Sequence, residues 1–306
     1  MRQSTMSLQP PYDFGRSISF WRRSTGELCE HWADGVYRRV ILLNNVPVIL
    51  TLHNVGSIEA PAVGVELDGR QATTAEMKFT EAQILHILGD NLNLREFYSA
   101  VMHDPILASL TQQFYGVRAP RSPLWETLCW IIAGQQISVP FAYRLKERLV
   151  KQYSAMYNVA DRPLYVFPSP TTVAQADPND LLSMQFSRNK TSFIIGLAQH
   201  IVDGTLHLDS LGDRSTTDAI AYLTKFRGIG TWTAEFTLLR SLGRPDALPA
   251  NDAGVRQGIE ALYGKRLAES DLRVFASQWG SWGGMVASYL LAWLRERSEQ
   301  RQKEKQ

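Results

Sequence analysis

The feature that most constrains the fold of this chain is a change in the spacing of apolar residues near Leu94. Upstream of it, short runs rich in β-branched residues at 35–55 and 62–69 are typical of antiparallel strands. Downstream of it, apolar residues recur with the spacing of helices that bury one face. The sequence therefore predicts an α+β chain, with a small N-terminal antiparallel sheet domain over residues 1–93 and an all-α region over residues 94–306.

Local signals refine this prediction. Asn44 and Asn45 tolerate positive φ and predict a hairpin turn between the two runs of segment 35–55. A sheet this small needs helices to bury its apolar face, and we expect them over 17–22 and 80–88. The charged tail at the C-terminus is expected to fray into solvent.

The composition excludes several classes of protein. The 306 residues include 32 basic and 30 acidic side chains, a net charge of +2, so any nucleic-acid-binding surface must be local. Two cysteines, Cys29 and Cys129, cannot form a disulfide framework or a four-thiolate metal site. No segment has the apolar length of a signal peptide or a membrane helix. We therefore expect an intracellular protein that does not act at a membrane, located in the cytoplasm or nucleoid of a bacterium or in the nucleus of a eukaryote.

The most informative motif is Gly228-Ile229-Gly230, which lies between two segments of helical spacing. Two glycines around one apolar residue make a tight turn whose backbone can approach another molecule closely. The turn leads into a helix N-terminus, where amide groups suit a phosphate oxygen. Such a helix-hairpin-helix can hold a DNA backbone without reading its sequence. Taken alone, however, the motif is better explained as an ordinary connection between two helices.

Asp252 is the second informative residue. It follows Pro249 in the segment LPAND, where proline ends one element and aspartate caps the next helix. Taken alone, it is better explained as a helix cap that contributes about 1 kcal/mol. Its combination with the hairpin is what suggests a function.

Five stretches in order along the chain resemble the helix-hairpin-helix (HhH-GPD) superfamily of base-excision DNA glycosylases, and within it the 3-methyladenine DNA glycosylase II branch. They are QPPYDF at 9–14, IAGQQISV at 132–139, the hairpin at 226–236, LPAND at 248–252 and WGSW at 279–282. The resemblance covers nearly the whole chain. It implies an N-terminal α/β domain like TATA-binding protein, followed by two helical lobes with the active-site cleft between them.

The resemblance implies that Asp252 drives the loss of a damaged base. Cleavage of an N-glycosidic bond builds positive charge on the deoxyribose, and a fixed carboxylate can stabilise that charge and orient the attacking water. At a helix N-terminus the carboxylate is held ionised. In branches that also cleave the DNA strand, a lysine nucleophile stands where this chain has Trp232. A monofunctional hydrolase is therefore expected.

The resemblance also implies a base pocket and a DNA-binding surface. A flipped, cationic base would stack on aromatic rings, which are expected from Phe20, Trp232, Phe236 and Trp282. Trp232 and Phe236, four positions apart on one helix, can equally be core residues. DNA contacts are expected from Gln135, Gln136, Gly228, Ile229, Gly230 and Thr231, with Gln136 filling the gap left by the flipped nucleotide. Further phosphate contacts are expected from Arg121, Lys190 and Arg227.

No cofactor is expected to be required, because the six histidines are scattered without metal-binding spacing. The resemblance implies only a structural Na⁺ or K⁺ ion in the hairpin, bound by the backbone carbonyl oxygens of Thr224, Phe226 and Ile229. The expected partner is double-stranded DNA that contains damaged bases, and the protein is expected to be a monomer.

Two positions depart from the family pattern and leave the base preference open. Ala253 stands where the family has a tyrosine, and Leu291 stands where it has a pocket tryptophan. The expected substrate is an alkylated base of the 3-methyladenine type, with oxidised or deaminated bases as the alternative. The other alternative is a non-catalytic DNA-binding protein, although such a protein would not need a carboxylate that repels phosphate.

Overall fold

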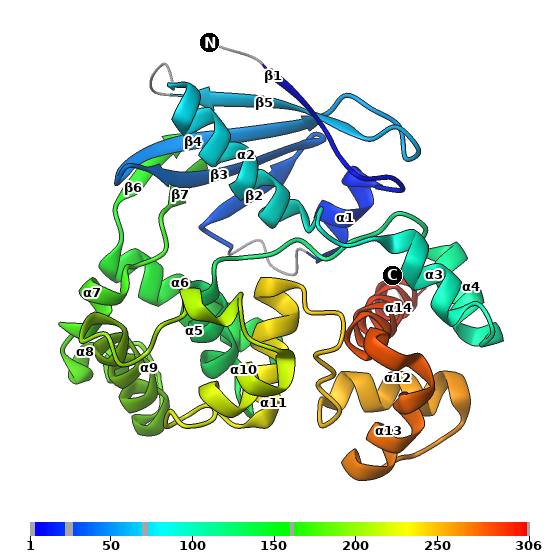
Figure 1. Cartoon of the computed structure of the whole chain (residues 1–306). Helices are drawn as coiled ribbons and strands as arrows, with labels where there is room; N and C mark the ends of the chain where they lie inside the picture. The colour runs from blue at the N-terminus through cyan, green and yellow to red at the C-terminus, as the bar shows by residue number, and fades with distance from the viewer. Residues whose placement is uncertain (1–3, 22–26, 69–72, 160–161, 305–306) are drawn as a thin grey trace.

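The computed structural model describes residues 4–21, 27–68, 73–159 and 162–304, without the side chains of Phe20 and Trp21. Figure 1 shows a sheet with its helices at the top and two groups of helices below it. The predicted α+β fold is therefore confirmed. Within the described part of the chain, no helix is both long and apolar enough to cross a bilayer.

The N-terminal sheet has five antiparallel strands in the order β1-β5-β4-β3-β2. They are β1 (Ser4–Ser7), β2 (Glu30–Ala33), β3 (Val36–Leu43), β4 (Val46–Asn54) and β5 (Ala62–Asp68). The predicted hairpin is confirmed, since Asn44 and Asn45 join β3 to β4 with φ values of 51° and 61°. The two edge strands were not predicted, because four residues are too few to show an alternating pattern.

Two helices pack with the sheet, α1 (Phe14–Trp21) and α2 (Thr74–Leu88). Both begin earlier than predicted. The start of α2 is set by Thr73, whose hydroxyl accepts a hydrogen bond from the Glu76 amide while the Glu76 carboxylate accepts one from the Thr73 amide. Ile84 and Leu88 of α2 share a buried core with Leu50 and Leu52 of β4.

The region after residue 93 contains twelve α-helices among the described residues. They are α3 (Leu94–Val101), α4 (Pro105–Gln113), α5 (Leu124–Gly134), α6 (Val139–Tyr153), α7 (Pro170–Ala174), α8 (Pro178–Ser183), α9 (Arg188–Val202), α10 (Thr216–Leu223), α11 (Thr231–Thr237), α12 (Ala253–Tyr263), α13 (Glu269–Ala276) and α14 (Gly283–Lys303). Three short turns of other helix types complete the region: η1 (Asp209–Leu211), η2 (Leu238–Leu242) and η3 (Ser277–Trp282).

One detail corrects the prediction that this region is all-α. Strands β6 (Met156–Val159) and β7 (Arg162–Tyr165) pair in an antiparallel hairpin. The Tyr165 amide donates a hydrogen bond to the Leu28 carbonyl, which attaches this hairpin to the N-terminal domain. Each strand has only four residues, too few for its pattern to differ from that of a loop.

The helices pack around two separate hydrophobic cores. Helices α5 to α11 and η2 surround the first core, and we call them the first lobe. Helices α3, α4, α12, α13 and α14 surround the second core, and we call them the second lobe. Figure 1 shows α3 and α4 beside α14, which is far from them in the sequence. The domain boundary between residues 93 and 94 stays a prediction.

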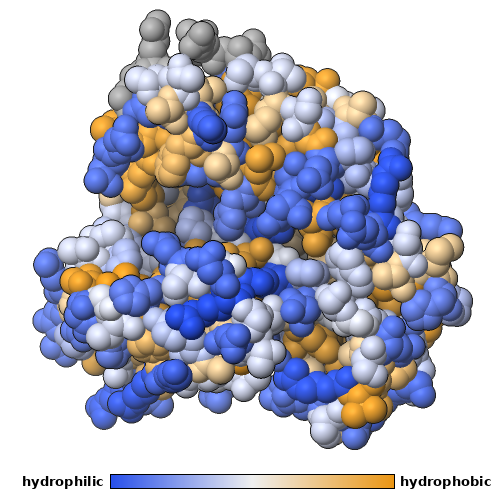
Figure 2. Space-filling model, viewed as in Figure 1, coloured by the Kyte–Doolittle hydropathy of each residue, from blue (hydrophilic) through white to orange (hydrophobic). Residues whose placement is uncertain are grey.

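A groove separates the N-terminal sheet from the first lobe. It has a volume of about 740 Å³ and lies between β3, α2 and the chain that leads into α7. Figure 2 shows a hollow in this part of the surface, bordered by apolar side chains of the sheet domain. Leu42 and Phe79, which line the groove, are both exposed.

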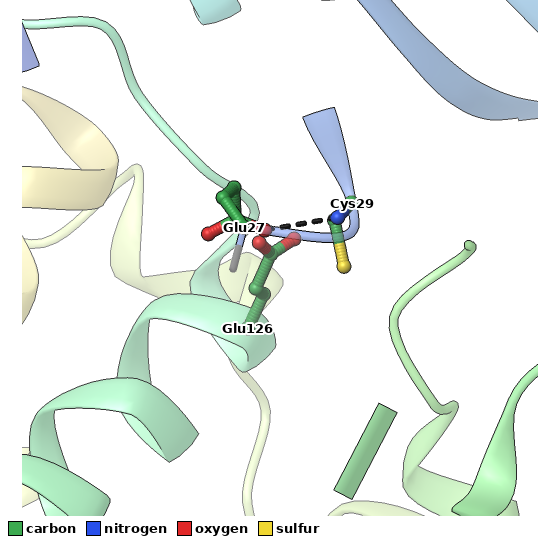
Figure 3. A group of neighbouring side chains, drawn as sticks. All are labelled: Glu27, Cys29 and Glu126. Atoms are coloured by element: carbon green, nitrogen blue, oxygen red, sulfur yellow. Dashed lines mark hydrogen bonds between the residues drawn. The ribbon is translucent and has the colours of Figure 1, made fainter. Parts of the chain in front are cut away.

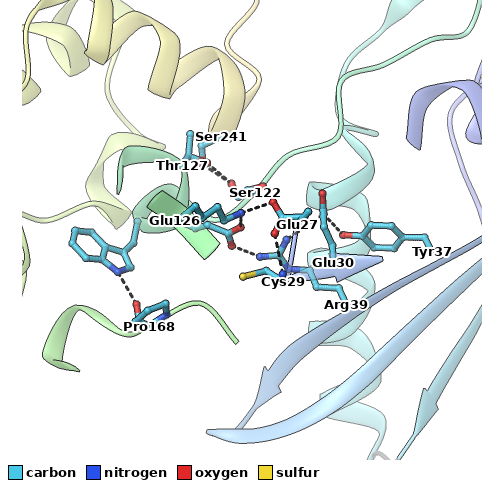
Figure 4. A network of polar contacts seen from close by, with 12 residues as sticks. Glu27, Cys29, Glu30, Tyr37, Arg39, Ser122, Glu126, Thr127, Pro168 and Ser241 are labelled. Atoms are coloured by element: carbon cyan, nitrogen blue, oxygen red, sulfur yellow. Dashed lines mark hydrogen bonds and ion pairs between the residues drawn. The ribbon is translucent and has the colours of Figure 1, made fainter. Parts of the chain in front are cut away.

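Buried charges join the N-terminal domain to the first lobe (Figure 4). The Glu126 carboxylate on α5 is paired with Arg39 of β3 and lies 2.8 Å from Lys146 Nζ of α6. Lys146 also lies 2.8 Å from a carboxylate oxygen of Glu27. Burial alone would raise the pKa of Glu126, but the charges of Arg39 and Lys146 lower it to about 2. This network fixes the sheet domain on α5 and α6.

We predict that Glu126→Gln lowers the free energy of unfolding at pH 7 by about 3 kcal/mol, because it removes a buried carboxylate that is paired with two buried cations, Arg39 and Lys146. The partly exposed Glu147, which pairs with the exposed Lys151 on α6, provides a control, and Glu147→Gln should cost less than about 0.5 kcal/mol. Urea unfolding measures both. The pKa of Glu126 is lowered from 4.5 in the folded protein, so its stabilising effect is present above pH 4.5 and lost as the pH falls toward 2. Equal losses in the two variants would contradict the prediction.

Candidate active site

A cleft of about 1150 Å³ lies where the end of α5, the turn before α11 and the start of α12 meet. Its lining includes most of the site residues predicted from the sequence: Gln135, Gln136, Gly228, Ile229, Gly230, Trp232 and Asp252. These residues come from three segments of the chain that span more than a hundred positions. The fold brings them together because α5 and α11 pack in the first lobe, while α12 packs in the second.

The predicted hairpin is formed by α10, a turn at 224–230 and α11. Its two glycines have different roles. Gly228 has a φ of 95°, and a Cβ there would lie 2.4 Å from Cγ of Phe193, so the fold itself requires glycine. Gly230 has a φ of −88°, and a Cβ there would meet no atom within 4 Å. Gly230 is therefore available to an external molecule.

Gln135 lies at the end of α5 and holds the hairpin. Its side-chain nitrogen donates to the carbonyl of Gly228 and to the hydroxyl of Thr233, both at 3.0 Å. These partners lie 93 and 98 positions away, so no local signal could have predicted this role. Gln136 follows the end of α5, has a φ of 57° and is exposed at the cleft.

Asp252 is the half-buried N-cap of α12. Its Oδ1 accepts a hydrogen bond of 3.0 Å from the Val255 amide, and its Oδ2 accepts one of 3.1 Å from the Trp232 indole N–H. The carboxylate is thus held by one donor from each lobe. The structure confirms that Asp252 caps α12 through Oδ1, while Oδ2 remains available for the hydrogen bond from Trp232.

The loop that leads to Asp252 is fixed by the start of α14. The amides of Gly284 and Met285 donate to the Pro245 carbonyl at 2.7 and 3.2 Å. A Cβ on Gly284 would lie 2.6 Å from the Ala247 carbonyl oxygen, so the loop lies directly on the helix. This packing positions Asp252 relative to the second lobe.

The predicted pocket aromatics do not all face the cleft. Trp232 lines it and packs on Phe236, with ring centroids 5.6 Å apart. Trp282 packs on Phe97 in the second lobe, with centroids 5.5 Å apart, and is not among the described residues that line the cleft. The side chain of Phe20 lies outside the described residues. Pocket roles for Phe20, Phe236 and Trp282 remain predictions.

The two departures from the family pattern lie beside Asp252. Ala253 is exposed at the cleft. Leu291 packs beneath Gly254, where an added Cβ would lie 2.6 Å from its Cδ2. The start of α12 therefore presents small and aliphatic side chains rather than rings.

Two of the cations predicted to contact phosphate are buried, and this part of the prediction is wrong. Arg121 is 4% exposed and Lys190 is 8% exposed. Lys190 Nζ donates a hydrogen bond of 2.7 Å to the Ala133 carbonyl, so it stabilises the C-terminal end of α5. Arg227, in contrast, is exposed at the cleft, with its guanidinium 5.6 Å from the centre of the Phe193 ring.

The carbonyls predicted to bind a monovalent cation belong to residues that line the cleft: Thr224, Phe226 and Ile229. The Phe226 carbonyl accepts a hydrogen bond of 3.1 Å from the Ile229 amide and retains a second lone pair. These oxygens are the ligand type that hard cations prefer. A bound Na⁺ or K⁺ ion stays a prediction.

A second group of potential metal ligands lies outside the cleft. Figure 3 shows Glu27, Cys29 and Glu126 side by side, with the Cys29 amide bonded to Glu27. Lys146 Nζ lies 2.8 Å from a carboxylate oxygen of each glutamate, and burial raises the pKa of the Cys29 thiol. The negative charge is already balanced, so this group acts as a structural ion network.

Comparisons with known proteins agree with this geometry. Residues 129–282, about half of the chain, match the profile of the HhH-GPD superfamily base excision DNA repair protein. Residues 2–128 match the 8-oxoguanine DNA glycosylase N-terminal domain. The DNA-3-methyladenine glycosylase of Bacillus subtilis is 28% identical over 93% of this chain and 95% of its own length.

Solved structures show the same fold. The 3-methyladenine DNA glycosylase of Archaeoglobus fulgidus is 26% identical, with a TM-score of 0.81 over 94% of this chain and 97% of its own. The 8-oxoguanine glycosylase/lyase of Clostridium acetobutylicum, in complex with double-stranded DNA, has a TM-score of 0.76 over 97% of this chain and 99% of its own, at 16% identity. With the hairpin, the cleft and the aspartate in the family's order, the chain belongs to the HhH-GPD superfamily of base excision DNA repair proteins.

Proposed function

We propose that this protein is a monofunctional DNA glycosylase that flips alkylated bases of the 3-methyladenine type out of double-stranded DNA and removes them by hydrolysis. The observation that carries the proposal is the Asp252 carboxylate, held at the cleft by Val255 and Trp232 beside the hairpin. The protein is proposed to act as an intracellular monomer.

The geometry suits hydrolysis of an N-glycosidic bond. As the base leaves, positive charge develops on the sugar, and a carboxylate fixed by two hydrogen bonds stabilises it without first having to reorient. The same carboxylate can orient a water molecule for attack on the sugar carbon. The base would leave neutral if it is a cationic alkylated purine, which makes it a good leaving group.

Two features favour alkylated over oxidised bases. Trp232 presents an electron-rich ring to the cleft, which attracts a cationic base. It also occupies the position of the lysine nucleophile in branches that cleave the strand. The B. subtilis and A. fulgidus relatives bear the name of 3-methyladenine glycosylases, which supports this choice. The N-terminal match to an 8-oxoguanine glycosylase domain keeps oxidised bases as the second candidate.

We predict that Asp252→Asn retains DNA binding and loses about a hundredfold or more in excision rate, because the change removes the charge that stabilises the sugar cation. Duplexes that carry one defined lesion are incubated with the protein, and alkali then breaks the strand at abasic sites. Asp104→Asn is the control, because Asp104 also caps a helix and accepts a hydrogen bond from an aromatic side chain, Tyr263, outside the cleft. Near-normal excision of a neutral base by Asp252→Asn would refute the assignment.

We also predict that no covalent intermediate forms. Borohydride added during turnover should trap no protein–DNA adduct, because Trp232 cannot form a Schiff base. A denaturing gel of labelled duplex measures the adduct. An adduct that maps to any lysine of this chain would show that the enzyme is a lyase.

Gly230→Asp is predicted to weaken binding to damaged and undamaged duplexes equally, because it places a negative charge where the backbone approaches phosphate. The slope of log K against log salt should fall by about one phosphate contact. Gly230→Ala should lose less. Gly196→Asp on α9 is the control, because a Cβ there also meets nothing within 4 Å.

A thermal melt first establishes that each glycine variant is folded. If folded Gly230→Asp bound undamaged duplex as tightly as wild type, with an unchanged salt slope, the turn would be only a connection between helices.

A further inference from the structure

Glu235 of α11 forms an ion pair with the second lobe. Its carboxylate oxygen Oε1 lies 2.8 Å from a guanidinium nitrogen of Arg273 on α13. The side chain of Glu235 is 3% exposed, whereas that of Arg273 is 38% exposed. Since α11 packs in the first core and α13 in the second, this pair connects the two lobes.

The Glu235 carboxylate depends on Arg273. Its other oxygen, Oε2, is buried and has no hydrogen-bond partner among the described residues. Burial raises the pKa of Glu235, and the opposing effect comes from its hydrogen bond and charge interaction with Arg273. Arg273 has a second acid, Glu269, one turn earlier on α13, at 2.8 Å. The pair is therefore asymmetric, because Arg273 would keep a partner without Glu235 but Glu235 would not keep one without Arg273.

The same helix carries the indole that holds Asp252. Trp232 and Glu235 are three positions apart, so they project from neighbouring positions on one side of α11. Trp232 donates to Asp252 at the start of α12, and Glu235 pairs with Arg273 on α13. Helix α11 is anchored in the first lobe by Ala234, which is fully buried. Both interactions with the second lobe therefore persist together only at one relative placement of α11 and that lobe.

We propose that Glu235 is a positioning residue for base excision: its ion pair with Arg273 holds α11 against the second lobe, so that the Trp232 indole stays hydrogen-bonded to the Asp252 carboxylate. This inference rests on the proposed function of Asp252. The loop between the lobes has its own attachment, through the Pro245 carbonyl and the start of α14. Loss of the ion pair should therefore shift α11 without detaching the loop.

The direct readout is the indole N–H resonance of Trp232 in protein labelled with ¹⁵N-tryptophan. Trp232→Phe assigns the resonance, and Asp252→Ala gives its position without the acceptor. In Glu235→Gln we expect the resonance to move toward its position in Asp252→Ala. Glu269→Gln is the matched control, because it removes the other carboxylate that pairs with Arg273. In this variant the Trp232 resonance should stay at the wild-type position.

The kinetic readout separates positioning from DNA binding. Single-turnover excision by Glu235→Gln should slow about tenfold, since a small misplacement of a catalytic group is costly. The Kd for undamaged duplex should stay within about twofold of wild type, because a residue that acts through Asp252 changes the chemical step. Arg273→Gln should slow excision, whereas Arg273→Lys, which keeps the charge, should retain most of the wild-type rate.

The double variant Glu235→Gln/Arg273→Gln leaves no buried unpaired charge and carries the same test if Glu235→Gln does not fold. It should show the shifted resonance and the slow excision. A wild-type resonance and rate in either folded variant would overturn the proposal. If the wild-type protein excised no base, the proposed function would fail, whereas the indole resonance would still report whether Glu235 holds α11.

Discussion

The hydrogen bond from the Trp232 indole to the Asp252 carboxylate connects the two helical lobes at the cleft. The other carboxylate oxygen of Asp252 accepts a hydrogen bond from the Val255 amide at the start of α12. A carboxylate held from both sides keeps one orientation, which is what electrostatic stabilisation of a developing cation requires. Much of the surrounding structure serves this arrangement: Gln135 fixes the hairpin that precedes Trp232, and the start of α14 fixes the loop that precedes Asp252.

The N-terminal domain is connected to the cleft indirectly, through the first lobe. It reaches the first lobe through buried charges on β3, α5 and α6, and through the β6–β7 hairpin. The same α5 that carries Glu126 in this network ends at Gln135, which holds the hairpin. One helix thus links the domain interface to the cleft. Burying an ion pair removes its charges from water, which offsets much of the favourable interaction between them. We therefore attribute to this network the fixed arrangement of the N-terminal domain on the first lobe.

The sequence could predict the parts of this protein whose signals are local. The Asn44-Asn45 turn, the glycine turn and the cap at Asp252 each depend on a few neighbouring residues, and the structure contains all three. The resemblance to a family added order to these signals. It also identified Ala253, which lies beside the aspartate at the cleft, as a departure from the family pattern.

What could not be predicted depends on contacts between distant residues. Lys190 and Arg121 appeared as available cations because sequence does not show burial, and both are buried in the structure. The roles of Gln135 and Glu235 depend on partners that only the fold brings near. Strands β6 and β7 were missed because their pairing stabilises segments too short to have a pattern.

The measurement that tests this account most directly is a single turnover on a duplex that carries one 3-methyladenine-type lesion. The products are analysed by mass spectrometry without alkali. Hydrolysis of the N-glycosidic bond predicts one free alkylated base per duplex and an intact strand. Absence of free base, or a strand broken without alkali, would contradict it.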